Sequence, residues 1–66
     1  MPDEPTDREL QVLEAVTRPR ATRYSAAREL GITPSTVRVH LHNLYRKLGV
    51  RTSGQAWRVL NGRQAA

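Results

Sequence analysis

The sequence predicts an all-α domain built from four helices. Apolar side chains recur at helical spacing in four separate segments, and threonines that can cap a helix precede three of them. The chain has 66 residues and no cysteine, so neither a disulfide framework nor a thiolate metal site can supplement its core. It forms one domain near the lower size limit for folding alone, and an enzyme with a shaped pocket is not expected from so small a core.

The first helix is expected from Thr6 to about Thr17, after a disordered lead-in over residues 1–5. Thr6 and Glu9 match a T-x-x-E capping box, in which each side chain bonds the backbone N–H of the other residue. The apolar stripe of this helix consists of Leu10, Leu13 and Val16, with Val12 beside them.

The second helix is expected from Thr22 to Leu30, because Pro19 breaks the first helix and Gly31 can close the second. Ala26 and Ala27 face inward with Leu30. Three arginines cluster around the break, Arg18, Arg20 and Arg23. They are interpreted as solvated loop charges, with contact to phosphate as the alternative.

The third helix is expected over residues 34–48, and the other segments are expected to pack around it and hold it in place. Thr33 can cap this helix, Pro34 suits its first position, and Gly49 can end it. Its core face consists of Val37, Leu41, Leu44 and Leu48. The link Gly31-Ile32-Thr33-Pro34 is short and contains glycine, which is typical of a helix-turn-helix.

The fourth helix is expected from Thr52 to about residues 61–62, with a T-x-x-Q cap between Thr52 and Gln55. Its apolar side consists of Ala56, Val59 and Leu60, and Trp57 lies at the edge of that side. Trp57 is interpreted as a core residue, and an interface anchor is the alternative. Residues 63–66 are expected to form a frayed tail.

Charge is divided unevenly along the chain. The net charge is +5, and all six acids precede Gly31, so residues 1–30 carry −1 and residues 31–66 carry +6. A surface built only for solubility mixes both signs. The segregation indicates a basic docking face for a polyanion on the C-terminal half.

The outer face of the third helix has side chains that suit the DNA major groove. Arginine can grip guanine O6 and N7, and a small apolar side chain can touch a thymine methyl. A solvated polar face is the alternative, because amphipathicity alone produces one. The face consists of Ser35, Arg38, Val39, His42 and Arg46.

From Thr6 to about Leu60 the chain resembles the LuxR-type (GerE, FixJ and NarL-like) helix-turn-helix domain of bacterial transcription regulators. Three blocks carry the resemblance: Thr6-x-Arg8-Glu9-x-x-Val12-Leu13, Ala27-x-x-Leu30-Gly31-Ile32-Thr33-x-x-Thr36-Val37-Arg38-x-His40, and Tyr45-Arg46-Lys47-Leu48-Gly49-Val50-Arg51 with Ala56. It implies a four-helix domain of the winged-helix-like class without a wing, here a stand-alone domain over residues 6–62.

The resemblance also implies roles for individual residues. The third helix enters the major groove, where Arg38, Val39 and His42 contact bases. The residues expected to contact or support the DNA backbone are Ser35, Thr36, His40, Arg46, Lys47 and Arg51. The fourth helix supports a homodimer, and its expected interface residues are Ala56, Trp57, Val59 and Leu60.

The sequence departs from the family pattern at three places. Pro5 replaces the apolar residue that precedes the first cap, and Arg-Pro-Arg replaces the glycine-containing turn between the first two helices. Ala26 stands where a larger aliphatic residue is usual, so we expect Tyr24 to fill the gap. No receiver or ligand-binding domain fits upstream, so regulation is expected in trans, by abundance, or not at all.

Other chemistry is not expected. On a helix, His40 and His42 lie about 200° apart and cannot share a metal, and no nucleophile has a base beside it. No cofactor is expected. No signal peptide or membrane span is visible, so the predicted location is the cytoplasm.

The predicted partner is double-stranded DNA, bound by a homodimer. A protein-binding adaptor or antagonist is the alternative, docking through the fourth helix on an RNA polymerase subunit or another regulator. A sigma-factor-like promoter-binding protein is a nearer alternative.

Overall fold

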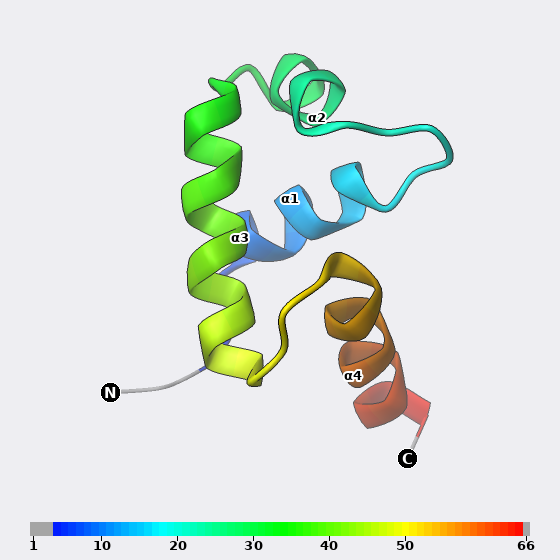
Figure 1. The fold of residues 1–66 in the computed structure, drawn as a ribbon. Coiled ribbons are helices and arrows are strands. Elements are labelled where there is room, and N and C mark those ends of the chain that lie inside the picture. Colours follow the sequence, from blue (N-terminus) through cyan, green and yellow to red (C-terminus); the bar gives the residue numbers. More distant parts are fainter. Residues whose placement is uncertain (1–3, 66) are drawn as a thin grey trace.

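The computed structural model describes residues 4–65, and within this range the backbone forms helices and turns without a strand. The helices are α1 (Asp7–Val16), α2 (Arg23–Leu30), α3 (Pro34–Leu48) and α4 (Ser53–Ala65). The all-α prediction is therefore confirmed. The longest helix, α3, lies along one edge of the molecule, and α1, α2 and α4 all lie to the same side of it (Figure 1).

Local capping explains where the first three helices begin. Thr6 and Glu9 form the predicted capping box, with hydrogen bonds of 3.1 Å and 2.9 Å. Thr22 forms a second box with Ser25, and the Thr33 hydroxyl accepts the N–H of Thr36 at 3.1 Å. These bonds satisfy N–H groups that a helix start leaves without backbone partners.

Two glycines end α2 and α3. Gly31 has φ 69° and Gly49 has φ 70°, the left-handed conformation that glycine adopts without a steric penalty. Both predicted stops are confirmed.

The ends of α4 differ from the expectation. Thr52 accepts the N–H of Gln55 as predicted, but the Gln55 side chain accepts the N–H of Arg51 at 2.9 Å instead of that of Thr52. The helix continues past Gly62 to Ala65 because Gly62 keeps an ordinary helical backbone and does not terminate it. The helix therefore extends beyond its predicted end near residues 61–62. Residues 1–3 of the predicted lead-in and Ala66 lie outside the described residues.

The core consists of two clusters that meet at α1. The first joins α1, α2 and α3 through Val12, Ala15, Ala26, Ala27 and Val37. The second joins α1, α3 and α4 through Leu13, Leu44 and Ala56. Leu41 packs against both clusters, as does Val16, so the predicted core face of α3 is confirmed.

Three core expectations are wrong. Leu10 is 37% exposed, while Ala15 is 1% exposed, because packing on two sides turns α1 so that Val12, Leu13 and Ala15 face inward. Tyr24 is 62% exposed and does not fill the space beside Ala26, which is itself buried. Trp57 is 46% exposed, so it is not a core residue.

An ion pair of Arg18 connects the link after α1 to α2. Arg18 donates to both oxygens of Glu29, at 3.1 Å and 2.8 Å, and lies 3.8 Å from Glu14. Arg20 has φ 63°, where glycine is the usual residue. The Arg18 side chain thus joins the end of α1 to α2 and is not a free cation.

The molecule measures 18 Å along its shortest axis. A helix with its side chains is about 10 Å wide, so every helix keeps a face at the surface. None of the described helices has the combined length and apolarity that crossing a bilayer requires.

Candidate nucleic-acid interface

The predicted outer face of α3 lies at the surface. All five of its residues are exposed, while Val37 and Leu44 on the opposite face are fully buried. The packing of α3 against α1 and α2 therefore decides which side chains face outward. We call the exposed set the α3 outer row; it consists of Ser35, Arg38, Val39, His42 and Arg46.

The α3 outer row contains hydrogen-bond donors and no acid of its own. No Asp or Glu occurs in the sequence of α3. Val39, 56% exposed, adds a small apolar contact between the polar groups. Such a row can donate hydrogen bonds to acceptors and cover one methyl group, and it carries positive charge.

Two predicted supporting residues are only partly exposed. Thr36 lies in the first turn of α3, where its hydroxyl is 2.9 Å from that of Thr33. His40 is partly buried on the flank of α3. Neither belongs to the α3 outer row.

Lys47 is held by an ion pair that the sequence analysis missed. Its Nζ donates to both carboxylate oxygens of Glu9, at 2.9 Å and 3.1 Å, and the two side chains are 24% and 5% exposed. Burial raises the pKa of Glu9, but the Thr6 N–H and the Lys47 ammonium outweigh it, so the pKa of Glu9 lies below its ordinary value. The positive charge of Lys47 is therefore balanced within the fold and joins α3 to α1.

Arg46 and Arg51 are placed differently from Lys47. Arg46 is exposed and shares a surface hollow with Glu9, Asn43 and Lys47. Arg51 is exposed in the turn between α3 and α4, where only its backbone N–H bonds Gln55.

Two residues at the start of α2 extend the basic surface. The Arg23 guanidinium lies 5.5 Å from the centre of the Tyr24 ring. Arg23 and Arg38 together line two hollows beside α3, of about 210 and 300 Å³, and neither hollow has a carboxylate in its lining. In the sequence, the cluster of arginines at positions 18, 20 and 23 was the feature that could have indicated this extension of the basic surface. The structure separates its members, because Arg18 pairs with acids, whereas Arg23 lies beside Arg38.

The predicted dimer residues of α4 do not share one face. Ala56 is fully buried in the second core cluster, so its assignment to an interface is wrong. Trp57 and Leu60 lie toward α1, with which they line a hollow. Val59 is partly buried and lies about 160° from Trp57 around the helix, so one flat partner surface does not hold both.

No three His, Cys, Asp or Glu side chains within the described part of the chain come close enough together to hold a metal ion. The groups that the fold does present are cations and hydrogen-bond donors on the exposed side of a helix that follows a tight turn. That arrangement is typical of a helix-turn-helix that contacts a nucleic acid.

Comparison with known proteins agrees with this geometry. The family model described as bacterial regulatory proteins, luxR family, matches residues 5–60. No curated protein and no solved structure matches the chain. The match covers the capping box of α1, the turn between α2 and α3, all of α3 and the first part of α4. The chain therefore belongs to the LuxR family of bacterial regulatory proteins, whose helix-turn-helix domains bind DNA.

Proposed function

We propose that this protein is a sequence-specific DNA-binding transcription regulator that acts in the cytoplasm and inserts α3 into the major groove. The observation that carries the proposal is the α3 outer row. It is exposed along its length, free of acids, and backed by a fully buried apolar face. Membership of the LuxR family and the net charge of +5 support the same conclusion.

Base contacts are assigned to Arg38, Val39 and His42. The planar guanidinium of Arg38 can donate two parallel hydrogen bonds to guanine, whose O6 and N7 are both acceptors. Val39 presents a branched apolar side chain to a thymine methyl, and His42 lies one turn beyond Arg38 on the same face.

Backbone contacts are assigned to Ser35, Arg46 and Arg51, and we add Arg23 because it lines two hollows together with Arg38. Each of these side chains is exposed. Thr36 and His40 are assigned supporting roles because both are partly buried. Lys47 is assigned to holding α3 against α1, since its ammonium already has a carboxylate partner.

A homodimer on two half-sites follows from the same proposal. Each copy contributes one recognition helix, and helix-turn-helix dimers place two such helices about 34–36 Å apart, which is one turn of DNA. The operator is then expected to be a pseudo-palindrome with half-sites about 10 base pairs apart.

Selection of binding sites from random duplex DNA, repeated at two salt concentrations, tests the proposal. A defined sequence motif is expected at both concentrations, with an affinity that falls steeply as salt rises, because each neutralised phosphate releases counterions. Enrichment of no motif contradicts sequence-specific binding. A motif that loses no affinity in salt contradicts the assignment of backbone contacts.

A second candidate is a protein-binding adaptor that docks on RNA polymerase or another regulator. The observation that favours it is the exposed Trp57, which lies between two hollows on the side of α1 and α4. Docking through an apolar patch depends weakly on salt, so the same titration separates the two functions.

A further inference from the structure

Two hollows beside α3 share the same pair of arginines. The first, of about 210 Å³, is lined by Arg23, Arg38, Leu41, His42 and Tyr45. The second, of about 300 Å³, is lined by Arg23, Tyr24, Pro34, Ser35 and Arg38. Together they reach the size of ordinary ligand pockets, which measure about 300–1,000 Å³. We call the two hollows the α2–α3 pocket.

The two arginines of the α2–α3 pocket are not neutralised by the fold. Among the side chains that the structure describes, the only cations in ion pairs are Arg18 and Lys47. Two cations beside one hollow repel each other, and an anion placed between them removes that repulsion. Arg23 and Arg38 therefore suit a negatively charged group from outside the chain.

The Arg23 side chain is positioned by the ring next to it. Its guanidinium lies 5.5 Å from the centre of the Tyr24 ring, a distance at which the face of the ring attracts a cation. A positioned guanidinium loses less side-chain freedom on binding, and its planar fork matches two oxygens of a carboxylate or a phosphate. The charged group that fits the pocket is therefore an oxyanion.

The first hollow also has a rigid apolar floor. Leu41 packs against both core clusters, and Tyr45 packs against the second. Burial raises the pKa of Tyr45, and a hydrogen bond with Ser53 offsets this only in part, so the phenol stays neutral and does not repel an anion. An aliphatic side chain and a phenol ring, both fixed by the core, offer a planar ring an apolar surface.

Duplex DNA does not use such a floor. Its bases stay stacked and present only their edges in the grooves, and the rest of its surface is sugar and phosphate. A free aromatic molecule, in contrast, can lay its ring against Leu41 and Tyr45 while its charge lies between the arginines. The apolar floor thus separates a small ligand from DNA as the occupant of this hollow.

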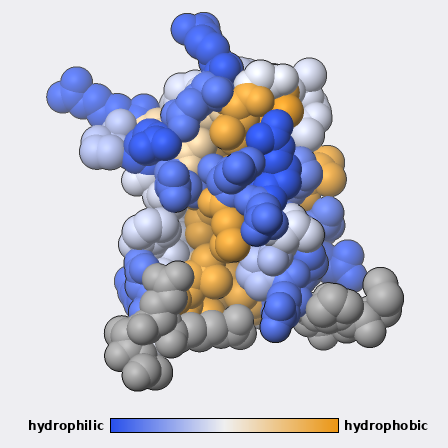
Figure 2. Space-filling view, turned by 180° about the vertical axis from the view of Figure 1, so that it is seen from behind, coloured by the Kyte–Doolittle hydropathy of each residue, from blue (hydrophilic) through white to orange (hydrophobic). Residues whose placement is uncertain are grey.

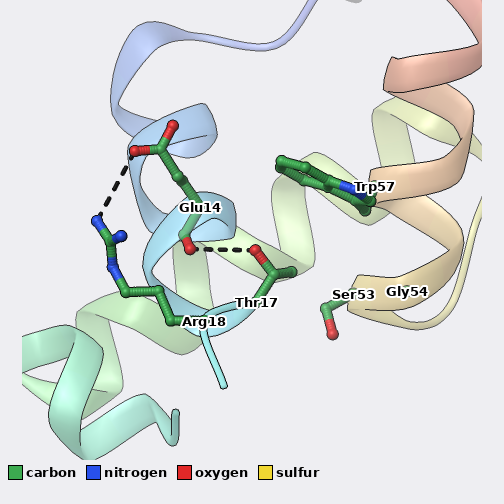
Figure 3. A pocket seen from close by; sticks show the side chains of 6 residues that line it. All are labelled: Glu14, Thr17, Arg18, Ser53, Gly54 and Trp57. Carbon is green, nitrogen blue, oxygen red and sulfur yellow. Dashed lines mark hydrogen bonds and ion pairs between the residues drawn. The ribbon is translucent and has the colours of Figure 1, made fainter. Parts of the chain in front are cut away.

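Two other features show what the α2–α3 pocket adds. The hollow of about 540 Å³ between α1 and α4 is bordered by Trp57 and Glu14, and its one arginine, Arg18, is paired with that glutamate (Figure 3). Apolar side chains also gather elsewhere at the surface, in a band bordered by hydrophilic ones on the side opposite to Figure 1 (Figure 2). A paired arginine or an apolar area alone selects no anion, whereas the α2–α3 pocket joins unpaired cations to an apolar floor.

We propose that the α2–α3 pocket binds a small aromatic anion, with its charged group between Arg23 and Arg38 and its ring against Leu41 and Tyr45. Because Arg38 is also the residue assigned to guanine, the ligand and the operator exclude each other. This consequence, unlike the site itself, rests on the proposed function. A ligand of this class then releases the protein from DNA without a separate regulatory domain.

Titration with 2-naphthoate, followed by NMR in the absence of DNA, tests the site. The resonances of Leu41, His42 and Tyr45 should shift with a dissociation constant of about 0.1–1 mM, an ordinary affinity for a probe of about 13 heavy atoms. Nuclear Overhauser effects should connect the naphthalene protons to Leu41 and Tyr45. The resonances of Trp57, which does not line the pocket, should not shift.

Two matched compounds separate charge from shape. 2-Naphthamide keeps the ring system without the charge, and acetate keeps the charge without the ring, so each should bind about tenfold more weakly than 2-naphthoate. 2-Naphthyl phosphate in the same titration distinguishes the two kinds of oxyanion, and the tighter of the two charged compounds identifies the group that the arginines prefer.

Arginine variants test which side chains hold the charge. Arg23→Gln and Arg38→Gln should each weaken 2-naphthoate binding about tenfold, because each removes one of the two cations. Arg28→Gln is the matched control, since Arg28 lies in α2, is exposed and lines neither hollow. All three side chains are at the surface, and circular dichroism checks that the variants fold.

Three results overturn the proposal: no contact between the naphthalene and the Tyr45 ring, equal affinity for 2-naphthoate and either matched compound, or equal effects of the three arginine variants. Competition with the selected duplex is measured in parallel. At ten times its dissociation constant, 2-naphthoate should lower the affinity for that duplex about tenfold, and acetate at the same concentration controls for ionic strength. Unchanged affinity overturns the exclusion between ligand and operator.

The two measurements fail independently. If the duplex binds and 2-naphthoate makes no contact with the pocket, the ligand site is wrong while the DNA function stands. If 2-naphthoate binds in the expected order of compounds and variants but no duplex is bound, only the DNA function fails.

Discussion

The two ends of α3 carry the same kind of charge and put it to different use. Near the N-terminal end, Arg38 is exposed beside Arg23, and no carboxylate lines the hollows that the two arginines share. At the C-terminal end, Lys47 is mostly buried and bonds both oxygens of Glu9. One end leaves its arginines exposed, and the other uses Lys47 to hold α3 against α1.

Burial and the nearest acid, more than charge alone, decide which role a cation takes. Lys47 and Arg46 are adjacent in sequence, yet Arg46 is exposed whereas the Lys47 amine faces Glu9. A buried ion pair is strongly destabilised when one partner is removed, because the other charge stays buried and uncompensated. An exposed cation contributes little to stability and remains available to phosphate.

Replacing Lys47 gives the largest expected effect. Lys47→Met should lower the free energy of unfolding by about 2–4 kcal/mol, somewhat less than for a fully buried pair. The whole free energy of unfolding for a chain of this length is about 3–10 kcal/mol. Arg46→Met, the matched control, should change stability by less than about 0.5 kcal/mol. Urea unfolding followed by circular dichroism measures both, and equal losses would mean that the two ends of α3 do not differ in this way.

The pH dependence of the free energy of unfolding in acid tests the same ion pair through Glu9. Because the pKa of Glu9 is lowered in the fold, its contribution is fully present above the unfolded value of about 4.3 and is lost as the pH falls through the folded value. Glu9→Gln keeps the hydrogen bond to the Thr6 N–H but carries no charge. The stability difference between wild type and Glu9→Gln should therefore shrink on acidification below about pH 4. A difference that stays constant in denaturation curves across that range would show that the ion pair contributes nothing.

Arg38 provides the corresponding test at the other end of α3. Arg38→Ala should lose about 1–3 kcal/mol of binding on the selected site and little on random duplex, because a guanine contact exists only on the right sequence. Its stability should remain close to that of the wild type, since the side chain is exposed. Competition binding with both duplexes measures the difference. Equal losses on the two would make Arg38 a phosphate contact instead.

Sequence patterns predicted the local features of the fold well. The starts at Thr6 and Thr33 and the stops at Gly31 and Gly49 depend on residues within one turn, so each is visible in a short stretch of sequence. The buried Val37 and Leu44 follow from helical periodicity alone.

The errors concern contacts between distant segments. Glu9 and Lys47 are separated by 38 positions, so no local spacing reveals their ion pair. Trp57 was interpreted as a core residue and Leu10 as part of an apolar stripe. However, α4 packs through Ala56 and leaves Trp57 exposed, while packing on two sides turns α1 so that Leu10 lies at the surface. Arg23 was interpreted as a solvated loop charge. Its position beside Arg38 depends on how α2 packs against α3, which the local sequence does not show.

Arg23 sharpens the contrast between cations that face outward and cations that are paired. Arg23→Gln should reduce the slope of log affinity against log salt by about 0.9, the value for one phosphate on duplex DNA. Lys47→Met, measured where it remains folded, should leave that slope unchanged. Binding across a series of salt concentrations gives both slopes. The reverse order of effects would place Lys47 in the DNA contact and Arg23 outside it.

Arg18 gives the smallest expected effect and separates burial from pairing. Its bonds to Glu29 are as short as those of Lys47 to Glu9, but the two side chains are 51% and 42% exposed. Water therefore screens this pair, and Arg18→Gln should cost far less stability than Lys47→Met at low salt. At molar salt the Debye length is about 3 Å, so the Arg18 contribution should vanish while most of the Lys47 contribution persists. Unfolding free energies of both variants at low and at molar salt measure this difference. If the two contributions fall together, the Glu9–Lys47 pair is reached by solvent like any surface pair, and Lys47 becomes available to DNA phosphates as well.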